Sequence, residues 1–121
     1  MAEVRMLLDA NLHRVFGNRD AAARRRVIEE TYTEDVTFTD PEGTVTGRDA
    51  LDERAGALLA GVPESFHFVA DGPVYVGADG GALAWAFGPP GSPVARGIDV
   101  VTVRDGRISE LRTMLARDTL P

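Results

Sequence analysis

The fold of this chain is decided by the stretch Asp99-Val100-Val101-Thr102-Val103-Arg104-Asp105-Gly106-Arg107-Ile108 near its end. Its β-branched residues are typical of a strand. Asp105-Gly106 predicts a tight hairpin turn, because aspartate and glycine adopt the positive φ angles that a two-residue turn needs. We therefore expect two antiparallel strands, over 94–104 and 107–115, joined at this turn.

The region between Glu64 and this hairpin also has the features of β-structure. Short segments predict strands over 65–70, 73–78 and 82–87. They are separated by the turn sequences Asp71-Gly72-Pro73, Asp79-Gly80-Gly81 and Gly88-Pro89-Pro90-Gly91. One earlier strand is predicted over 33–40, and Pro41-Glu42-Gly43 breaks it.

Three helices are predicted in the first half of the chain. Residues 3–16 carry an apolar stripe at helical spacing, made of Val4, Leu8, Leu12, Val15 and Phe16. A second helix begins at a cap formed by Asp20 or Asn18 and runs to about Tyr32. A third runs from about Asp49 to Ala60. The basic run 24–26 is interpreted as a solvated helix face that meets Glu29 and Glu30 one turn on.

The element order α-α-β-α-β-β-β-β-β predicts one α+β domain over residues 1–121. Helices come first and hairpin-connected strands come last, which is typical of an antiparallel sheet covered by helices on one face. A curved sheet closed by three helices forms a cone. The mouth of such a cone is a natural hydrophobic pocket for a small molecule.

The composition of the 121 residues excludes several kinds of chemistry. All 13 basic residues are arginine, and the chain has no cysteine. Without lysine there is no Schiff base or P-loop lysine, and without cysteine there is no thiol nucleophile, disulfide or cysteine-bound metal. No glycine-rich nucleotide motif follows a strand. We expect no cofactor and no metal, because the two histidines, His13 and His67, lack ligand spacing.

The net charge of −6 argues against a nucleic-acid partner. The first residues carry Glu3, Arg5, Asp9 and Arg14, and no apolar run approaches the length of a membrane span. We expect a cytoplasmic protein with no membrane partner.

The order of these elements resembles the NTF2-like (cystatin-like) superfamily, and more closely its SnoaL-like and ketosteroid-isomerase-like members. The resemblance covers nearly the whole chain. Besides the two opening helices, it is carried by the stretches 32–41, 47–51 and 99–108. It implies a cone of three N-terminal helices on a curved mixed or antiparallel sheet. This fold hosts several reactions as well as non-enzymatic binders.

The resemblance implies a catalytic pair of aspartates. Asp40 in Asp40-Pro41 matches the general base of the ketosteroid isomerases, and Asp99 resembles their protonated aspartate, which donates a hydrogen bond to the oxyanion. The family's oxyanion tyrosine has no counterpart. Counting back from Asp20 leads to Leu12, and the neighbouring His13 points about 100° away on the helix.

The residues themselves also single out the two carboxylates. Asp40 shares a strand face with Val36 and Phe38, where burial would raise its pKa, although an aspartate before proline is also common in turns. Asp99 lies in an apolar strand on the face of Val101 and Val103, where a buried carboxylate rarely serves stability. A bond to Arg96 or Arg112, or an edge position, is the structural alternative.

Several large side chains are candidates for the pocket wall. With Leu12 and His13, they are Phe16, Tyr32, Phe38, Leu58, Leu59, Trp85 and Met114. A stripe of this kind is more often plain core. His67 lies on the face opposite Phe66 and Phe68, so it faces outward if those rings face the helices and enters the pocket if they do not.

The sequence therefore predicts a cofactor-independent enzyme in which Asp40 moves a proton next to a carbonyl and a neutral Asp99 stabilises the enolate of a hydrophobic substrate. Polyketide cyclisation and epoxide hydrolysis are related alternatives. A non-catalytic ligand-binding or dimerisation module is the alternative from another class. A homodimer is expected, because the strand 94–104 carries apolar residues on both faces and one face needs cover.

Overall fold

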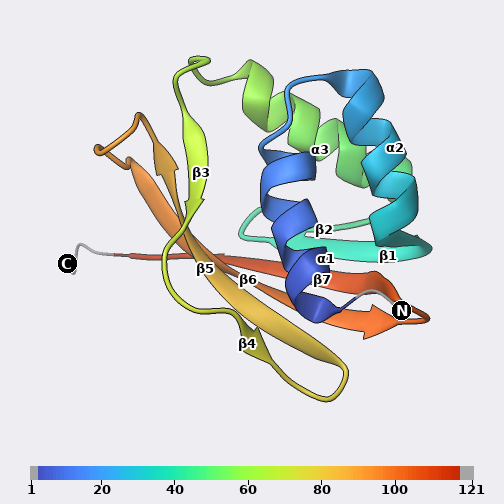
Figure 1. Ribbon diagram of the computed structural model, residues 1–121. Helices are drawn as coiled ribbons and strands as arrows, with labels where there is room; N and C mark the ends of the chain where they lie inside the picture. The colour runs from blue at the N-terminus through green and yellow to red at the C-terminus, as the bar shows by residue number, and fades with distance from the viewer. Residues whose placement is uncertain (1–2, 118–121) are drawn as a thin grey trace.

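In the computed structural model, which describes residues 3–117, the helices cover one face of a curved seven-stranded sheet (Figure 1). The helical segments are α1 (Val4–Asp9), its continuation η1 (Ala10–Phe16), α2 (Ala21–Thr31) and α3 (Arg48–Ala60). The strands are β1 (Tyr32–Asp40), β2 (Gly43–Thr46), β3 (His67–Ala70), β4 (Tyr75–Val76), β5 (Gly80–Gly88), β6 (Ala95–Arg104) and β7 (Arg107–Leu115). The predicted three-helix cone on a curved sheet is confirmed.

The sheet is mixed. Its strand order is β2-β1-β7-β6-β5-β3, and β4 pairs with β5. All strand pairs are antiparallel except β1 with β7, which run parallel. Strand β2 was not predicted, because its sequence Gly-Thr-Val-Thr at the sheet edge has little apolar character. Pro41 and Glu42 therefore form the turn of a hairpin rather than a simple break.

The predicted turn between β6 and β7 is confirmed. Asp105 has a φ of 56° and Gly106 a φ of 78°, the positive values that a two-residue hairpin turn requires. Along β6, Asp99 and Val101 are buried while Val100 is half-buried on the opposite face. The turn thus sets the register that aims Asp99 at the helices.

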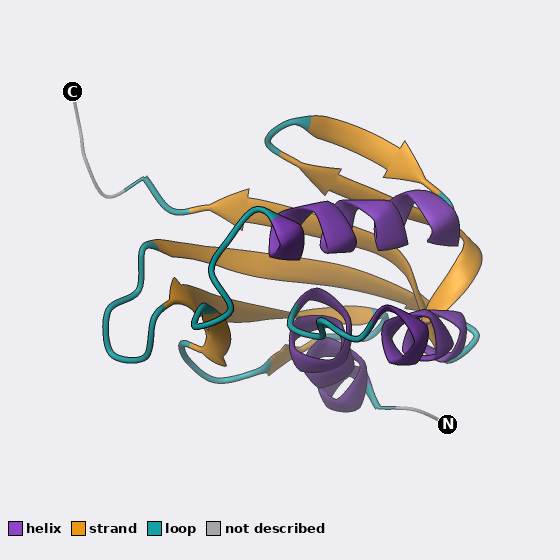
Figure 2. Ribbon diagram, turned by 90° about the horizontal axis from the view of Figure 1, so that it is seen from above, coloured by secondary structure: helices purple, strands orange, loops and turns teal. Residues whose placement is uncertain are grey.

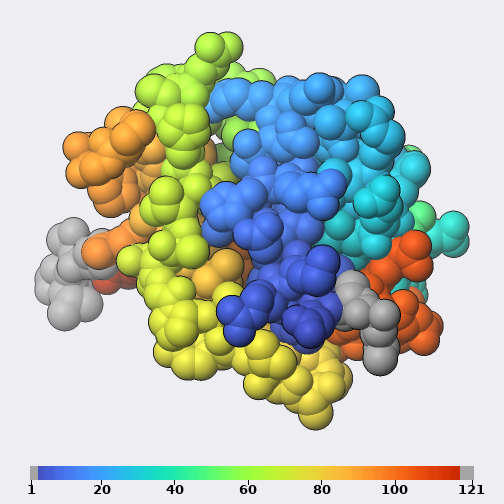
Figure 3. Space-filling view, viewed as in Figure 1, coloured from blue at the N-terminus to red at the C-terminus, as the bar shows by residue number. Residues whose placement is uncertain are grey.

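The first helix changes its winding along its length. After Asp9 it continues as a π-helix through Phe16, a wider form that is frequent at functional sites. Asn11, Leu12 and Val15 are all fully buried on it. In the space-filling view this blue segment packs against the yellow-green β3–β4 region (Figure 3).

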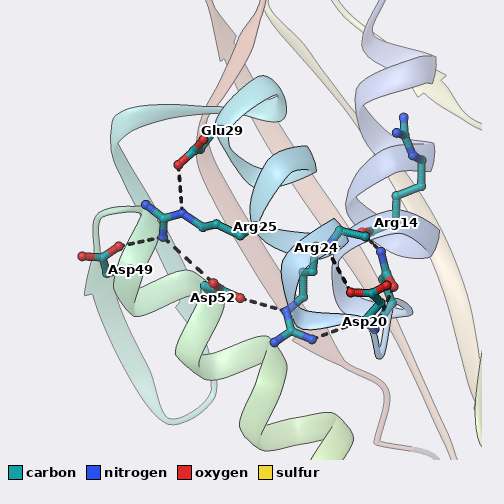
Figure 4. A network of polar contacts seen from close by, with 9 residues as sticks. Arg14, Asp20, Arg24, Arg25, Glu29, Asp49 and Asp52 are labelled. Carbon is teal, nitrogen blue, oxygen red and sulfur yellow. Dashed lines mark hydrogen bonds and ion pairs between the residues drawn. The ribbon is translucent and has the colours of Figure 1, made fainter.

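A charged network joins α2 to α3 (Figure 4). Arg24 is buried and donates from Nε to Asp52 at 2.8 Å, and Arg25 bonds Asp49 at 2.6 Å and Glu29 at 3.1 Å. The prediction of a solvated face is therefore wrong for Arg24, because α3 packs over it and supplies its partner. The predicted cap is confirmed, since Asp20 accepts a hydrogen bond from the amide of Ala23.

Viewed from above, the helices lie in front of the strands (Figure 2). The core fills the space between these two layers, and Leu8, Ile28, Leu51, Ile108 and Leu111 are fully buried there. No helix formed by residues 3–117 lies over the other face of the sheet, and His67 is exposed while Phe68 is buried. Among residues 3–117, none of the helices is both long and apolar enough to cross a bilayer.

Candidate active site

A pocket of about 440 Å³ opens between the helices and the sheet. Its wall is mostly apolar and includes Leu12 and Phe16 from the π-helix, Phe38 from β1, and Phe68 and Trp85 from β3 and β5. The rings of Phe16 and Phe38 lie 5.4 Å apart, and those of Phe68 and Trp85 lie 5.3 Å apart, edge to face. This size and lining are typical of a site for a small hydrophobic molecule.

Asp99 is the polar centre of this pocket. It is 6 % exposed and receives three hydrogen bonds. Oδ1 accepts from the Trp85 indole at 3.1 Å and from the Thr113 hydroxyl at 2.7 Å. Oδ2 accepts from the Asn11 amide at 2.9 Å. The three donors are thus an indole, a hydroxyl and an amide, from β5, β7 and the π-helix.

The sheet register places these donors. Asp99 on β6 stands directly opposite Thr113 on β7, and Trp85 on β5 stands opposite Gly97. A side chain at position 97 would collide with the Trp85 ring, because a Cβ there would lie 2.6 Å from it. Glycine at this position therefore lets the indole lie close against β6, where its N–H reaches Asp99.

Burial raises the pKa of Asp99 from its ordinary value of 3.8 to about 6. The hydrogen bonds from Thr113, Trp85 and Asn11 oppose this rise, because they stabilise the charged form. At pH 7, above this pKa, the ionised carboxylate is therefore the main form of Asp99. A carboxylate with this pKa can take up and release a proton near neutral pH.

Behind Asp99 lies a second, fully buried pair. The Tyr32 hydroxyl donates to Oδ1 of Asn11 at 2.5 Å, and neither residue has any exposed surface. Burial raises the pKa of Tyr32 well above its usual range, and the Asp99 charge raises it further. Tyr32 therefore stays protonated and acts as a hydrogen-bond donor.

Asp40 stands at the end of β1, in the same sheet as Asp99 and separated from its strand by β7. Its Oδ2 lies 2.5 Å from Nη1 of Arg54 on α3, and its Oδ1 accepts the Glu42 amide at 2.9 Å. Arg54 also lies 3.8 Å from the Glu42 carboxylate and stacks over the Phe38 ring at 5.7 Å. Asp40 thus both caps the β1–β2 turn and faces the pocket.

The structure brings the two predicted aspartates into one pocket. Of the predicted apolar set, Leu12, Phe16, Phe38, Leu58 and Trp85 line it.

Four predicted wall residues lie elsewhere. Tyr32 is behind the pocket in the hydrogen-bonded pair, and Leu59 on α3 is buried in the core. Met114 is 52 % exposed, because it alternates with Thr113 and so faces the outer side of β7. The imidazole of His13 is 43 % exposed and lies 3.9 Å from Asp9, on the solvent side of the helix.

Four residues of the site were not predicted from the sequence, namely Asn11, Arg54, Phe68 and Thr113. Asn11 had a readable signal, because it interrupts the apolar stripe of the first helix between Leu8 and Leu12 at helical spacing. Arg54 and Thr113 had none, since each reaches the pocket only through packing of distant segments. Within residues 3–117 no three histidine or acidic side chains gather in a way that could hold a metal ion.

Comparison with known structures finds the same fold. A proposed isomerase of the SnoaL-like family from Agrobacterium tumefaciens is 22% identical over 94% of this chain and 97% of its own, with a TM-score of 0.86. A proposed ketosteroid isomerase from Kribbella flavida is 16% identical over 98% of this chain and 81% of its own, with a TM-score of 0.74. A de novo designed protein with a curved β-sheet reaches 0.75 at 14% identity, covering 95% of this chain and 86% of its own. At these identities the likeness concerns the fold.

The comparison with curated proteins gives no match. The sequence model of the SnoaL-like domain matches residues 10–111, which run from the start of the π-helix to the middle of β7. This span contains Asn11, Asp40 and Asp99. The chain therefore belongs to the family of SnoaL-like domains.

Proposed function

We propose that this protein is a cofactor-independent enzyme that moves a proton on a hydrophobic carbonyl compound bound in the pocket. The observation that carries the proposal is Asp99, a carboxylate buried among aromatic side chains with a pKa of about 6. A general base is most effective when its pKa lies near the working pH. Three donors hold this carboxylate in place, so little reorganisation is needed before it reacts.

In the proposed reaction, Asp99 removes the proton from the carbon next to the carbonyl. The C–H electron pair forms an enolate, and the proton rests on the carboxylate until it returns to the same or another carbon. Isomerisation and aldol cyclisation of a polyketide both begin with this step. The apolar wall around Asp99 excludes water, which strengthens the electrostatic interactions of the enolate.

The contacts favour exchanging the roles that the sequence suggested for the two aspartates. Asp99 is the acceptor in all three of its hydrogen bonds. This arrangement stabilises an ionised carboxylate, which acts as a base, better than a protonated carboxyl that donates to the substrate. Asp40 is already paired with Arg54. We assign to Arg54 the stabilisation of the enolate oxygen, because it supplies a cation with five N–H donors at the pocket wall. Asp40 then orients Arg54.

Deuterium incorporation from D₂O into a panel of hydrophobic ketones, followed by mass spectrometry, tests the reaction. Asp99→Asn should lower the exchange rate by ~100-fold or more, the usual contribution of a general base. Asp9→Asn is the matched control, since Asp9 lies on the exposed side of α1 and should leave the rate unchanged. If Asp40→Asn abolishes exchange while Asp99→Asn does not, the roles are those suggested by the sequence.

A non-catalytic ligand-binding module is the second candidate. Leu12 favours this candidate. It is an apolar residue of the pocket wall, at the position where the ketosteroid isomerases have their oxyanion tyrosine. In that case Asp99→Asn changes the affinity for a retained hydrophobic molecule, and the wild-type protein exchanges no deuterium. Mass spectrometry of small molecules that co-purify with the protein would identify the ligand class.

We also propose that two copies assemble through the outer face of the sheet. Ile98 and Val100 on β6 are half-buried there, and Met114 on β7 is exposed. A partner sheet is the simplest cover for these apolar residues.

A further inference from the structure

The two oxygens of Asp99 are not equivalent. Oδ1 accepts two hydrogen bonds, from Trp85 and Thr113, and an ionised carboxylate oxygen has room for about two. Oδ2 accepts one, from Asn11. With respect to donors from residues 3–117, the acceptor position that remains free is therefore on Oδ2.

The Asn11 amide can help Oδ2 only in one orientation. Its NH₂ group must face Asp99, because the reversed amide would turn its oxygen towards the carboxylate and repel it. The Tyr32 hydroxyl selects this orientation by donating to Oδ1 of Asn11. Tyr32 is itself anchored, since its backbone carbonyl accepts from Arg48 at 2.7 Å and 3.1 Å.

We propose that Tyr32 and Asn11 are positioning residues that act through Asp99, keeping its Oδ2 as the atom that accepts the proton. The proposal rests on the proposed function, in which Asp99 is the base. Neither residue lines the pocket, so neither contacts the substrate directly. Their polar groups are fully buried, and a leucine and a phenylalanine would fill this part of the core without the cost of desolvating an amide and a hydroxyl.

Other charged groups that share the pocket with Asp99 must be kept constant in a test. They are Arg54 on α3, and Asp40 and Glu42 at the β1–β2 turn. None of them bonds to Tyr32 or Asn11 within the described part of the chain. Substitutions at Tyr32 and Asn11 therefore leave this set of charges in place.

The test is a carbon-13 NMR titration of the Asp99 carboxyl in the protein without ligand. Asn11→Leu removes one donor to the charged form and should raise the pKa by about one unit, which is tenfold in proton affinity. Tyr32→Phe should also raise the pKa of Asp99, but by less. The Asn11 amide is still present in this variant, although no hydroxyl fixes its orientation. The double variant should titrate like Asn11→Leu alone, since Tyr32 acts only through Asn11.

The matched control is Tyr75→Phe, which removes the hydroxyl of the chain's other tyrosine at a position that is 62 % exposed. It should leave the Asp99 titration unchanged. The proposal is overturned if Tyr32→Phe titrates like the wild type, or if the shifts of the two single variants add in the double variant. Tyr32→Phe is nearly isosteric, so it decides the matter even if Asn11→Leu fails to fold.

The pH dependence of deuterium exchange separates this proposal from the proposed function. In Tyr32→Phe the rising limb of the rate profile should move up in pH by as much as the titration does. If the wild type exchanges no deuterium but the titrations shift as described, the proposed enzymatic function is wrong, and the proposal that Tyr32 and Asn11 act through Asp99 stands. If the wild type is active and Tyr32→Phe changes neither the Asp99 titration nor the pH profile of exchange, the positioning role of Tyr32 and Asn11 is wrong, and the proposed enzymatic function stands.

Discussion

In the variant Asp99→Asn, the free energy of unfolding should increase relative to wild type as the pH rises from about 4 to about 7.5. The folded pKa of Asp99 is about 6, above the ordinary value of 3.8 that applies to the unfolded chain. The native state therefore binds this proton more tightly than the unfolded state does. The stabilising contribution is fully present below pH 3.8 and is lost as the pH rises through 6.

The size of the effect follows from the shift. The folded pKa lies about two units above the unfolded value, and each unit corresponds to 1.36 kcal/mol, so wild type loses about 2–3 kcal/mol from this group across the interval. Asparagine carries no charge and escapes this loss. The amide of the new asparagine places a donor next to the Asn11 amide, and this lowers the stability of the variant. Because neither amide titrates, this cost does not change with pH. The change in the difference between the two proteins with pH is therefore the quantity to measure.

Urea denaturation of wild type and Asp99→Asn at several pH values gives this difference. Contributions of the other titrating groups cancel, because both proteins contain them. Asp9→Asn serves again as the control and should follow wild type at every pH. A difference between Asp99→Asn and wild type that stays constant from about pH 4 to about pH 7.5 would refute the reasoning, since Asp99 would then titrate alike in the folded and unfolded chain.

Three further predictions concern the surroundings of the site. Gly97→Ala should displace the Trp85 ring and lower the free energy of unfolding by about 1–3 kcal/mol. The displacement should change the indole N–H resonance and the destabilisation should lower the urea midpoint. An unchanged resonance would contradict the close packing of the ring against Gly97. Arg24→Ala should cost about 2 kcal/mol in urea denaturation, because Asp52 loses its partner between α2 and α3, and a neutral result would mean that water replaces the guanidinium. In sedimentation at tens of micromolar the wild type should be a dimer and Met114→Glu a monomer; a monomeric wild type excludes the outer-face interface.

Local signals were sufficient to predict most elements. The Asp105-Gly106 turn and the Asp20 cap each depend on a few neighbouring residues, and both are where the sequence indicated. The short edge strand β2 was missed because it is stabilised by pairing with β1 rather than by its own side chains. The parallel pairing of β1 with β7 left no signal, since it joins segments far apart in the chain.

The residues of the candidate site also fall into those with a local sequence signal and those without one. Asp40 and Asp99 could be found because a carboxylate on the apolar face of a strand is costly and stands out in the pattern. Arg54 and Thr113 could not, because arginine on a helix and threonine on a strand are ordinary until packing brings them to a carboxylate. The burial of Arg24 likewise depends on Asp52, which lies on another helix.

The sequence by itself determined the α+β class, the hairpin that carries Asp99 and the strand face that Asp99 shares with Val101, because these follow from alternation and turn chemistry within a few residues. Only the tertiary structure decided what surrounds the carboxylate. Trp85 and Thr113 come from neighbouring strands, and Asn11 comes from the helix layer, where it accepts a hydrogen bond from Tyr32 at the start of β1. The pKa of a buried acid is set by desolvation and by donors from such distant segments, so the chemistry of Asp99 became defined only when the helices closed over the sheet.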